Sequence, residues 1–315
     1  MSVLNRVCKP FWGTVVWLLV IWPAAADTLQ QRIEQLTRSH KATVGVSVVD
    51  PWGYPVVELN GSTQFPLQSV FKFYQALYVL HLVQQNQLSL QQPIRIERKS
   101  LLQNSWSPML KQHKEDNFSL TLAELLRYAV RDSDNNACDL LFDLTGGPAQ
   151  LELYLRQLGI QELQIRATER QMHSGWSVQF ENWSSVGAAS RILQRFLSGQ
   201  LLNAQLQPQL WLWMSHSSTG QNRLRGQLPK TAVVAHKTGT SGIQAQIRAA
   251  VNDTGVILLP DGRAVLVTVF ITASRESLDK DEALMAAIGR AVWDFYLQPP
   301  RYQGLTDLVD ADVPN

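Results

Sequence analysis

A long apolar segment with a single charge most strongly constrains the fold of this chain. From Phe65 to Leu80 nearly every residue is apolar, and Lys72 is the only formally charged residue between Glu58 and Arg95. A helix that is apolar on nearly all sides packs inside a protein. Burying an ammonium group is costly unless its pKa falls or a counter-charge lies nearby. The segment therefore predicts a buried helix with a functional lysine, and a structural core lysine is the alternative.

Ser69 lies three residues before Lys72, on the same face of the predicted helix. At the start of a helix, free backbone N–H groups and the positive end of the dipole favour a developing oxyanion. A serine hydroxyl also needs a neighbouring base before it becomes a good nucleophile. Spacing alone is weak evidence, because Ser277 and Lys280 repeat it in a charged segment. The apolar surroundings of Lys72 distinguish the first pair and predict a nucleophile with its base.

The hydrophobic pattern divides the chain into strands at both ends and helices between them. After a short helix at 28–39, strands are expected at 43–49, 54–59, 232–235, 255–259 and 264–271, and a last helix at 281–297. This order predicts an α/β (α+β sandwich) fold, in which a mixed, mainly antiparallel sheet is built from both termini, flanked by helices and joined by an inserted all-helical domain. The expected divisions are a signal peptide at 1–26, a discontinuous α/β domain at 27–66 and 218–298, a helical domain at 67–217, and a C-terminal tail at 299–315.

The N-terminal segment has the pattern of a secretory signal. Arg6 and Lys9 precede an apolar stretch, and small residues before Asp27 predict cleavage there; an uncleaved membrane anchor is the alternative. We therefore expect a periplasmic protein that does not contact the membrane after cleavage. Cys138 would then be the only cysteine, so an internal disulfide is excluded. Its apolar helical setting predicts a core residue.

Charge and histidine spacing exclude two classes of function. The 315 residues include 28 basic and 26 acidic side chains, which gives no basic footprint for nucleic acid. The histidines outside the loop at 166–173 form no metal-binding pair and ligand cysteines are absent, so a zinc site is excluded. We expect no metal or cofactor, a small-molecule substrate, and a monomer.

Two tripeptides follow the Ser-x-x-Lys pair in order. Ser133-Asp134-Asn135 follows an apolar helix at 122–130, where a simple helix cap is the alternative, and Lys237-Thr238-Gly239 follows a strand at 233–236. This set is typical of class A β-lactamases and penicillin-binding proteins. From about 28 to 298 the chain resembles class A serine β-lactamases. Gln68, Arg223 and the segment 235–242 resemble the PER-type subgroup of extended-spectrum enzymes.

The resemblance implies a role for each residue of these motifs. Ser69 is the expected nucleophile, activated by Lys72 or by a glutamate through water, a choice that the sequence leaves open. Ser133 is expected to relay a proton to the leaving nitrogen, and Asn135 to contact the acyl amide. The substrate carboxylate is expected to bind Lys237, Thr238 and Thr240, and Gly239 to allow the backbone to approach the ligand closely. The backbone N–H groups of Ser69 and Thr240 are the expected oxyanion hole.

Glu169 is the predicted base for deacylation, because it lies 36 residues after Ser133, as the family pattern requires. Ala167, His173 and Asn182 depart from the commonest class A pattern, and with Asn182 the usual Arg–Asp salt bridge cannot form. These departures imply an altered loop path and a roomier site. His173 either helps to hold the hydrolytic water or packs within the loop. Further expected site residues are Gln68 as a substrate-binding residue, Trp106 as a wall of the cleft, and Arg223 as a positive charge beside Lys237. A surface cation is the alternative for Arg223.

The resulting prediction is a serine β-lactamase that confers antibiotic resistance. It would hydrolyse penicillins and cephalosporins, with an extended spectrum, through an acyl-enzyme on Ser69. A D-Ala-D-Ala carboxypeptidase or penicillin-binding enzyme, which deacylates slowly, is the first alternative. A non-catalytic binding protein with the same fold is the second.

Overall fold

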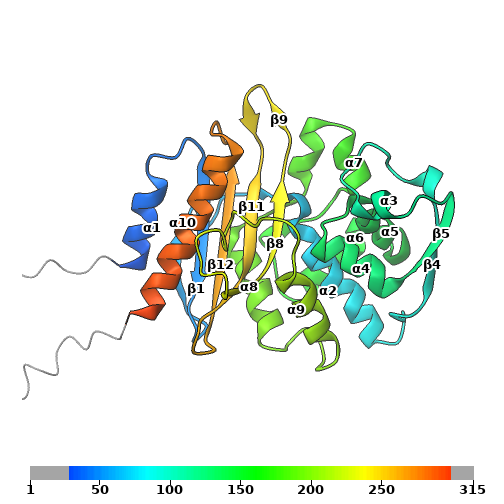
Figure 1. The fold of residues 1–315 in the computed structure, drawn as a ribbon, viewed down its shortest axis with the longest axis horizontal. Helices are drawn as coiled ribbons and strands as arrows, with labels where there is room; N and C mark the ends of the chain where they lie inside the picture. The colour runs from blue at the N-terminus through cyan, green and yellow to red at the C-terminus, as the bar shows by residue number, and fades with distance from the viewer. Residues whose placement is uncertain (1–27, 299–315) are drawn as a thin grey trace, which may run out of the picture.

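The computed structural model describes residues 28–298, so the predicted signal peptide and C-terminal tail lie outside the described residues. Figure 1 shows a central sheet with helices on both faces and a group of helices beside its β8 edge. The strands are β1 (Thr43–Val49), β2 (Pro55–Leu59), β3 (Phe65–Pro66), β4 (Pro93–Glu97), β5 (Asn117–Thr121), β6 (Leu163–Gln164), β7 (Trp183–Ser184), β8 (Val233–Thr240), β9 (Ile243–Gln244), β10 (Ile247–Arg248), β11 (Val251–Leu258) and β12 (Ala264–Thr272).

The helices are most numerous between β3 and β8. The α-helices are α1 (Leu29–Thr37), α2 (Phe71–Gln84), α3 (Pro108–Gln112), α4 (Leu122–Arg131), α5 (Asn135–Thr145), α6 (Pro148–Gln157), α7 (Glu169–His173), α8 (Val186–Leu197), α9 (Leu206–Ser215) and α10 (Leu278–Leu297). Three 3₁₀ segments are η1 (Gln68–Val70), η2 (Arg98–Ser100) and η3 (Trp176–Glu181).

The main sheet joins the two ends of the described chain, as the sequence predicts. Its order is β2-β1-β12-β11-β8. Each neighbouring pair is antiparallel, so the sheet is more uniform than the predicted mixed one. Strand β1 pairs on its two sides with β2 and with β12, which places the first strand beside the last.

Strand β8 is longer than predicted and contains Lys237-Thr238-Gly239, which was expected to follow the strand. The added length comes from pairing with β11, where Lys237 lies opposite Thr254 and Thr238 opposite Asp253. β11 in turn begins at Val251 rather than at Gly255. Polar residues near the start of β11 interrupt the apolar pattern, so this pattern does not predict where the strand begins.

Alternation along β12 gives the sheet two packed faces. Val267 and Val269 pack in one cluster with residues of α1 and α10, whereas Leu266 and Phe270 pack in the larger cluster of the helical region. Helix α8 covers this second face and contacts β1, β11 and β12 (Figure 1). Helix α8 lies at positions of the predicted helical domain, although it packs on the sheet. The domain boundaries stay a prediction.

Helix α2 is the buried helix that the apolar segment predicts. Most of its residues are buried, and Lys72 has no exposed surface. It packs among α4, α5, α6 and α9. Cys138 of α5 is also buried and free, as predicted, and burial raises the pKa of its thiol well above the usual value. Within residues 28–298, no helix is long and apolar enough to cross a bilayer.

Candidate active site

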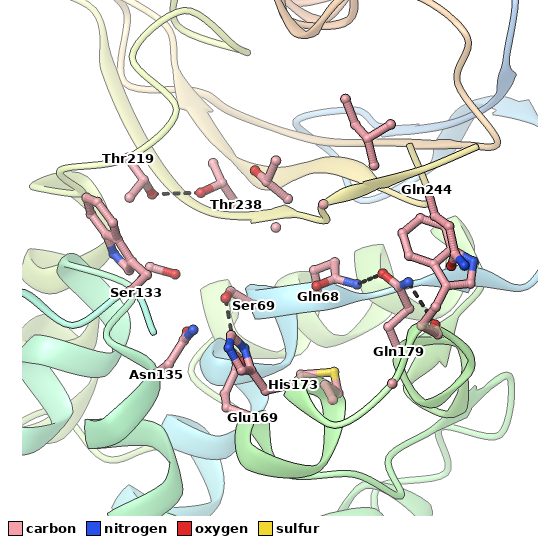
Figure 2. A pocket seen from close by; sticks show the side chains of 18 of the residues that line it. Gln68, Ser69, Ser133, Asn135, Glu169, His173, Gln179, Thr219, Thr238 and Gln244 are labelled. Carbon is pink, nitrogen blue, oxygen red and sulfur yellow. Dashed lines mark hydrogen bonds between the residues drawn. The ribbon is translucent and has the colours of Figure 1, made fainter. Parts of the chain in front are cut away.

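A cleft of about 680 Å³, hereafter the main cleft, opens between β8 and the helical region. Figure 2 shows Ser69, Ser133, Asn135, Glu169 and Thr238 around it. These five residues come from η1, the turn before α5, α5 itself, α7 and β8. The cleft therefore gathers the sequence motifs although up to 169 positions separate them.

The Ser69 hydroxyl lies between a cation and a carboxylate. Lys72 Nζ donates a hydrogen bond of 2.9 Å to Ser69 Oγ, and Ser69 Oγ donates to Glu169 Oε1 at 3.4 Å. Lys72 Nζ and Glu169 Oε1 are 2.8 Å apart. The hydroxyl therefore contacts a carboxylate that can accept its proton and an amine that can accept it in its neutral form, which is the arrangement of an activated nucleophile.

Two more oxygens surround the Lys72 amine. It donates to the backbone carbonyl of Ser133 at 2.9 Å and to Asn135 Oδ1 at 2.5 Å. These contacts and Glu169 satisfy a fully buried ammonium group, as its burial requires. The predicted functional lysine is thus brought into contact with the predicted nucleophile and with two residues of the Ser-Asp-Asn motif.

Lys237 approaches the same serine motif from the sheet. Its Nζ donates to Ser133 Oγ at 2.8 Å and to the Thr238 carbonyl at 3.0 Å. Burial, followed by repulsion from Lys72, holds the pKa of Lys237 well below its usual value. Both acceptors are uncharged, so this amine is suited to binding an anionic group that enters the cleft.

Strained backbone lies on both sides of the nucleophile. Gln68 has φ +48° and Ser133 has φ +57°, in the left-handed region that ordinary residues rarely adopt. Such conformations persist only where the surrounding structure fixes them, and they cluster at functional sites. Asp134 fixes the second one, because it caps α5 through Ala137 N at 2.9 Å. The cap that was the alternative reading of this motif thus coexists with its place in the site.

Gly239 permits the close approach of β8 to η1. A Cβ atom added there would lie 2.5 Å from the Leu67 carbonyl oxygen and 3.3 Å from Ser69 N. No side chain fits in that space, so the requirement for glycine is steric. The close packing brings the backbone around Thr240 to the turn that contains Ser69, where the sequence predicts an oxyanion hole.

Arg223 is buried beneath β8 and is not a surface cation. It forms an ion pair with Glu282, 3.0 Å from Nε to Oε1, and donates to Thr240 Oγ1 at 2.6 Å. Its Nη1 also donates to the Gly239 carbonyl at 3.0 Å. The guanidinium therefore orients the Thr240 hydroxyl, and it lines the main cleft.

The helical side of the cleft is lined by Asn135 and Trp106. Asn135 Nδ2 donates to Ser105 Oγ at 2.8 Å, which fixes the orientation of the amide. The Trp106 indole donates to the Asp132 carbonyl at 2.9 Å, and about half of the side chain is exposed at the cleft. Trp106 thus lies at the wall where the sequence predicts it.

The loop that carries Glu169 is anchored by side chains at seven successive positions. The backbone N–H groups of residues 165–171 each donate to a side-chain oxygen, at distances between 2.7 and 3.2 Å. Five of these seven hydrogen bonds are accepted by side chains outside the loop, namely Glu152, Asn182 and Asp139. Asn182 also donates to the Ala167 carbonyl at 2.7 Å, so an amide replaces the absent salt bridge.

Asp139 lies directly beneath the base. Its carboxylate accepts from Glu169 N at 2.8 Å and from Arg170 N at 2.9 Å. Burial, and then the charge of Glu169, raises the pKa of Asp139 to about 6. The position of Glu169 thus depends on a carboxyl group that ionises only near neutral pH.

On the far side of Ser69, Gln68 joins the nucleophile's turn to η3. Gln68 Nε2 donates to Gln179 Oε1 at 2.8 Å, and Gln179 Nε2 donates to the Trp176 carbonyl at 2.8 Å (Figure 2). His173 also lines the main cleft, but within residues 28–298 no hydrogen bond of its side chain decides between its two predicted roles. The role of His173 stays a prediction.

Several residues of the site escape the sequence analysis. Thr219 shares a hydrogen bond of 2.6 Å with Thr238 Oγ1, and it comes from a polar loop without a recognisable motif. Asp139 and Gln179 are equally unmarked in the sequence. Of these three residues, Asp139 alone could have been suspected from the sequence. It is a polar residue at a position of α5 that helical periodicity places on the buried face.

The comparisons with known proteins agree with this geometry. Residues 28–296 match the profile described as the β-lactamase enzyme family. Over 275 residues, 87% of this chain and 89% of the relative, the sequence is 46% identical to the extended-spectrum β-lactamase PER-1 of Pseudomonas aeruginosa. It is 36% identical to β-lactamase VEB-1 of the same organism, over 90% of this chain and 95% of that protein.

Solved structures give the same result for the fold. The TLA-3 extended-spectrum β-lactamase superposes with a TM-score of 0.84 at 34% identity, over 86% of this chain and 98% of that one. A β-lactamase from Chitinophaga pinensis superposes with a TM-score of 0.83 at 39% identity, over 85% and 99% of the two chains. The predicted fold class is therefore confirmed.

Proposed function

Because this chain belongs to the β-lactamase enzyme family and is a class A β-lactamase, we propose that it hydrolyses penicillins and cephalosporins through an acyl-enzyme on Ser69. One observation carries the proposal: the Ser69 hydroxyl contacts both the Lys72 amine and the Glu169 carboxylate. A nucleophile with two proton acceptors can be activated for attack and can afterwards be released by water.

In acylation, Ser69 Oγ attacks the β-lactam carbonyl and its proton passes to Lys72 or, through water, to Glu169. Contact with both groups leaves each route open. The carbonyl oxygen becomes an oxyanion, and the backbone N–H groups of Ser69 and Thr240 are the proposed donors to it. The approach of β8 to the Ser69 turn at Gly239 supports this role.

Opening of the ring requires a proton on the departing nitrogen. Ser133 is suited to deliver it, because its hydroxyl contacts Lys237 Nζ and its carbonyl contacts Lys72 Nζ. The substrate carboxylate would bind Lys237 together with the hydroxyls of Thr238 and Thr240, and Arg223 and Thr219 orient those hydroxyls. Asn135 would bind the acyl amide.

Deacylation requires a water molecule and a base. Glu169 lies 3.4 Å from the Ser69 oxygen that becomes the ester oxygen, so its carboxylate is placed to take a proton from a water molecule that attacks the ester. The anchored loop keeps the carboxylate in that place. The names of the relatives PER-1 and TLA-3 describe extended-spectrum enzymes, which supports the same breadth here and a role in antibiotic resistance. Periplasmic export remains a prediction from residues 1–26.

Intact-mass measurement after mixing with a cephalosporin tests this function. The wild-type protein is expected to show a transient adduct with turnover. Glu169→Ala is expected to acquire the adduct and to retain it, because Lys72 still contacts Ser69 for the first step whereas the second step loses its base. Deacylation should slow by roughly a hundred- to ten-thousandfold. A persistent adduct on the wild type would indicate a penicillin-binding enzyme, and no adduct would indicate a binding protein. Normal turnover by the variant would refute the role of Glu169.

A further inference from the structure

A buried polar pair lies on β8 and β11, next to the residues that are proposed to bind the substrate carboxylate. His236 Nδ1 is 2.8 Å from Asp253 Oδ1 and 3.0 Å from Asp253 Oδ2, and neither side chain has exposed surface. Because a carboxylate only accepts hydrogen bonds, the imidazole carries a proton on Nδ1 and donates it to Asp253. We name these two residues the His236–Asp253 pair.

The His236–Asp253 pair interrupts an apolar layer on one face of the main sheet. Side chains alternate along a strand, so His236 shares a face of β8 with Val234. In the same way, Asp253 shares a face of β11 with Val251. Both valines pack in the apolar cluster that includes residues of α1 and α10. A buried carboxylate carries a desolvation cost that an apolar side chain does not, so its place in this layer indicates a role that valine could not fill.

Both members of the pair contact the turn at 219–224, which lies between α9 and β8 in the chain. Asp253 Oδ2 accepts a hydrogen bond of 3.2 Å from Leu224 N, at the end of the turn. Near its start, a Cβ atom added to Gly220 would lie 3.3 Å from His236 Cε1, so the imidazole lies against Gly220. Gly220 has φ +70°, a conformation that favours glycine. The pair therefore holds the turn at both ends.

This turn carries the two side chains that orient the hydroxyls of the carboxylate site. Thr219 shares a hydrogen bond of 2.6 Å with Thr238 Oγ1 (Figure 2). Arg223 Nη2 donates to Thr240 Oγ1 at 2.6 Å, and Arg223 lies between the two ends of the turn that the pair holds. A displacement of about 1 Å at a binding group can cost on the order of a hundredfold in rate. The place of the turn thus decides how well both hydroxyls meet an anionic group.

The turn also packs against α10. Arg223 forms its ion pair with Glu282 of this helix. No Cβ atom fits at Gly289 of α10, because the Leu224 carbonyl occupies that space. The turn is therefore enclosed between a helix and the sheet, and the His236–Asp253 pair provides polar contacts from the sheet.

We propose that His236 and Asp253 are positioning residues for recognition of the substrate carboxylate, because they hold the turn at 219–224 in place. The inference rests on the proposed function and adds to it two residues that do not line the main cleft. The pair is expected to support the binding of an anionic group rather than the chemistry at Ser69. Its loss should therefore affect β-lactams with a free carboxylate more than those without one.

Benzylpenicillin and its methyl ester test this proposal, because they differ only in whether the carboxylate is free. The wild-type protein is expected to have a higher kcat/KM for the acid. Asp253→Asn removes the charge that binds Leu224 N, and it should reduce the acid-to-ester ratio of kcat/KM roughly tenfold. His236→Phe keeps a ring against Gly220 but removes the donor to Asp253, and it should reduce the ratio roughly threefold. Both substrates are measured on one preparation, so the ratio does not depend on the fraction of a variant that folds.

A double-mutant cycle distinguishes positioning through the turn from a general structural role. In a protein that already carries Arg223→Ala, the further change Asp253→Asn should reduce the ratio by less than it does in the wild type. An equal reduction in both backgrounds overturns the proposal, because Asp253 would then act independently of Arg223.

The control is Asp261→Asn, the same substitution at an exposed position between β11 and β12. It should leave the acid-to-ester ratio unchanged. A wild-type ratio near one, or a ratio that neither His236→Phe nor Asp253→Asn alters, overturns the proposal although hydrolysis proceeds. Failure of the wild-type protein to hydrolyse benzylpenicillin would instead refute the proposed function, and the inference with it.

Discussion

The two buried lysines of the main cleft differ in what neutralises them. On the helical side, Lys72 has a carboxylate at 2.8 Å and a side-chain amide oxygen at 2.5 Å. On the sheet side, the hydrogen-bond partners of Lys237 Nζ in the described part of the chain are a hydroxyl and a carbonyl, and burial lowers the pKa of Lys237. The charge of Lys72 is therefore neutralised by a carboxylate of the protein, whereas the charge of Lys237 is suited to neutralisation by an anionic ligand.

This difference separates chemistry from recognition. A compensated amine stays in place and can exchange a proton with Ser69 in each cycle. An uncompensated, desolvated amine gains most when a carboxylate arrives, because a charge-assisted hydrogen bond then replaces neutral ones. We expect substitutions on the helical side to act on kcat and those on the sheet side to act mainly on KM.

Among the substitutions that test this difference between the two lysines, Lys72→Ala is expected to have the largest effect. It removes the amine that contacts Ser69 Oγ, and acylation should slow by roughly a hundred- to ten-thousandfold, as measured by stopped-flow with a chromogenic cephalosporin. Lys280→Ala is the matched control, since Lys280 follows Ser277 at the same spacing on an exposed surface. An unchanged acylation rate in Lys72→Ala would make Lys72 purely structural.

A smaller effect is expected from Lys237→Ala. Loss of a charged hydrogen bond of about 1.5–3 kcal/mol should raise KM for penicillins by roughly ten- to a hundredfold. Because the pKa of Lys237 is lowered, its charge and its affinity for a carboxylate are lost as the pH rises through that lowered value. Steady-state kinetics would contradict the contrast if kcat fell and KM did not change.

The smallest expected effect concerns Asp139, which lies beneath Glu169 on the compensated side. Its folded-state pKa, about 6, lies above the usual value, so it contributes stability below pH 4 that is lost as the pH rises through 6. Relative to the wild type, Asp139→Asn should therefore gain roughly 2–4 °C in Tm between pH 4 and pH 7. Parallel Tm curves in calorimetry would show that the Asp139 carboxyl titrates normally.

The sequence predicted those parts of the fold that depend on apolar patterns. The buried helix around Lys72 and the strands of both termini follow from hydrophobic runs, and the structure confirms them. The extent of β8 and β11 could not be predicted in this way. Asn252 and Asp253 interrupt the apolar pattern, and they are tolerated in a buried strand because Pro66 and His236 bond to them.

The candidate site was predictable where a residue belongs to a motif. Ser69, Lys72, Ser133 and Lys237 meet as the motifs imply, because chemistry fixes their spacing and order. Thr219 and Gln179 act through contacts with residues that are distant in the chain. Their side-chain types are common, so only the three-dimensional arrangement distinguishes them from ordinary polar residues.

The anchoring of residues 165–171 has a consequence for how this protein can evolve. The backbone of the loop that carries Glu169 donates hydrogen bonds to the side chains of Glu152, Asn182 and Asp139. None of these three residues lines the main cleft. A replacement at any of the three is expected to move Glu169 at the cleft, although the replaced side chain itself does not line the cleft. Selection for hydrolysis of a new antibiotic can therefore act on positions that do not contact the antibiotic.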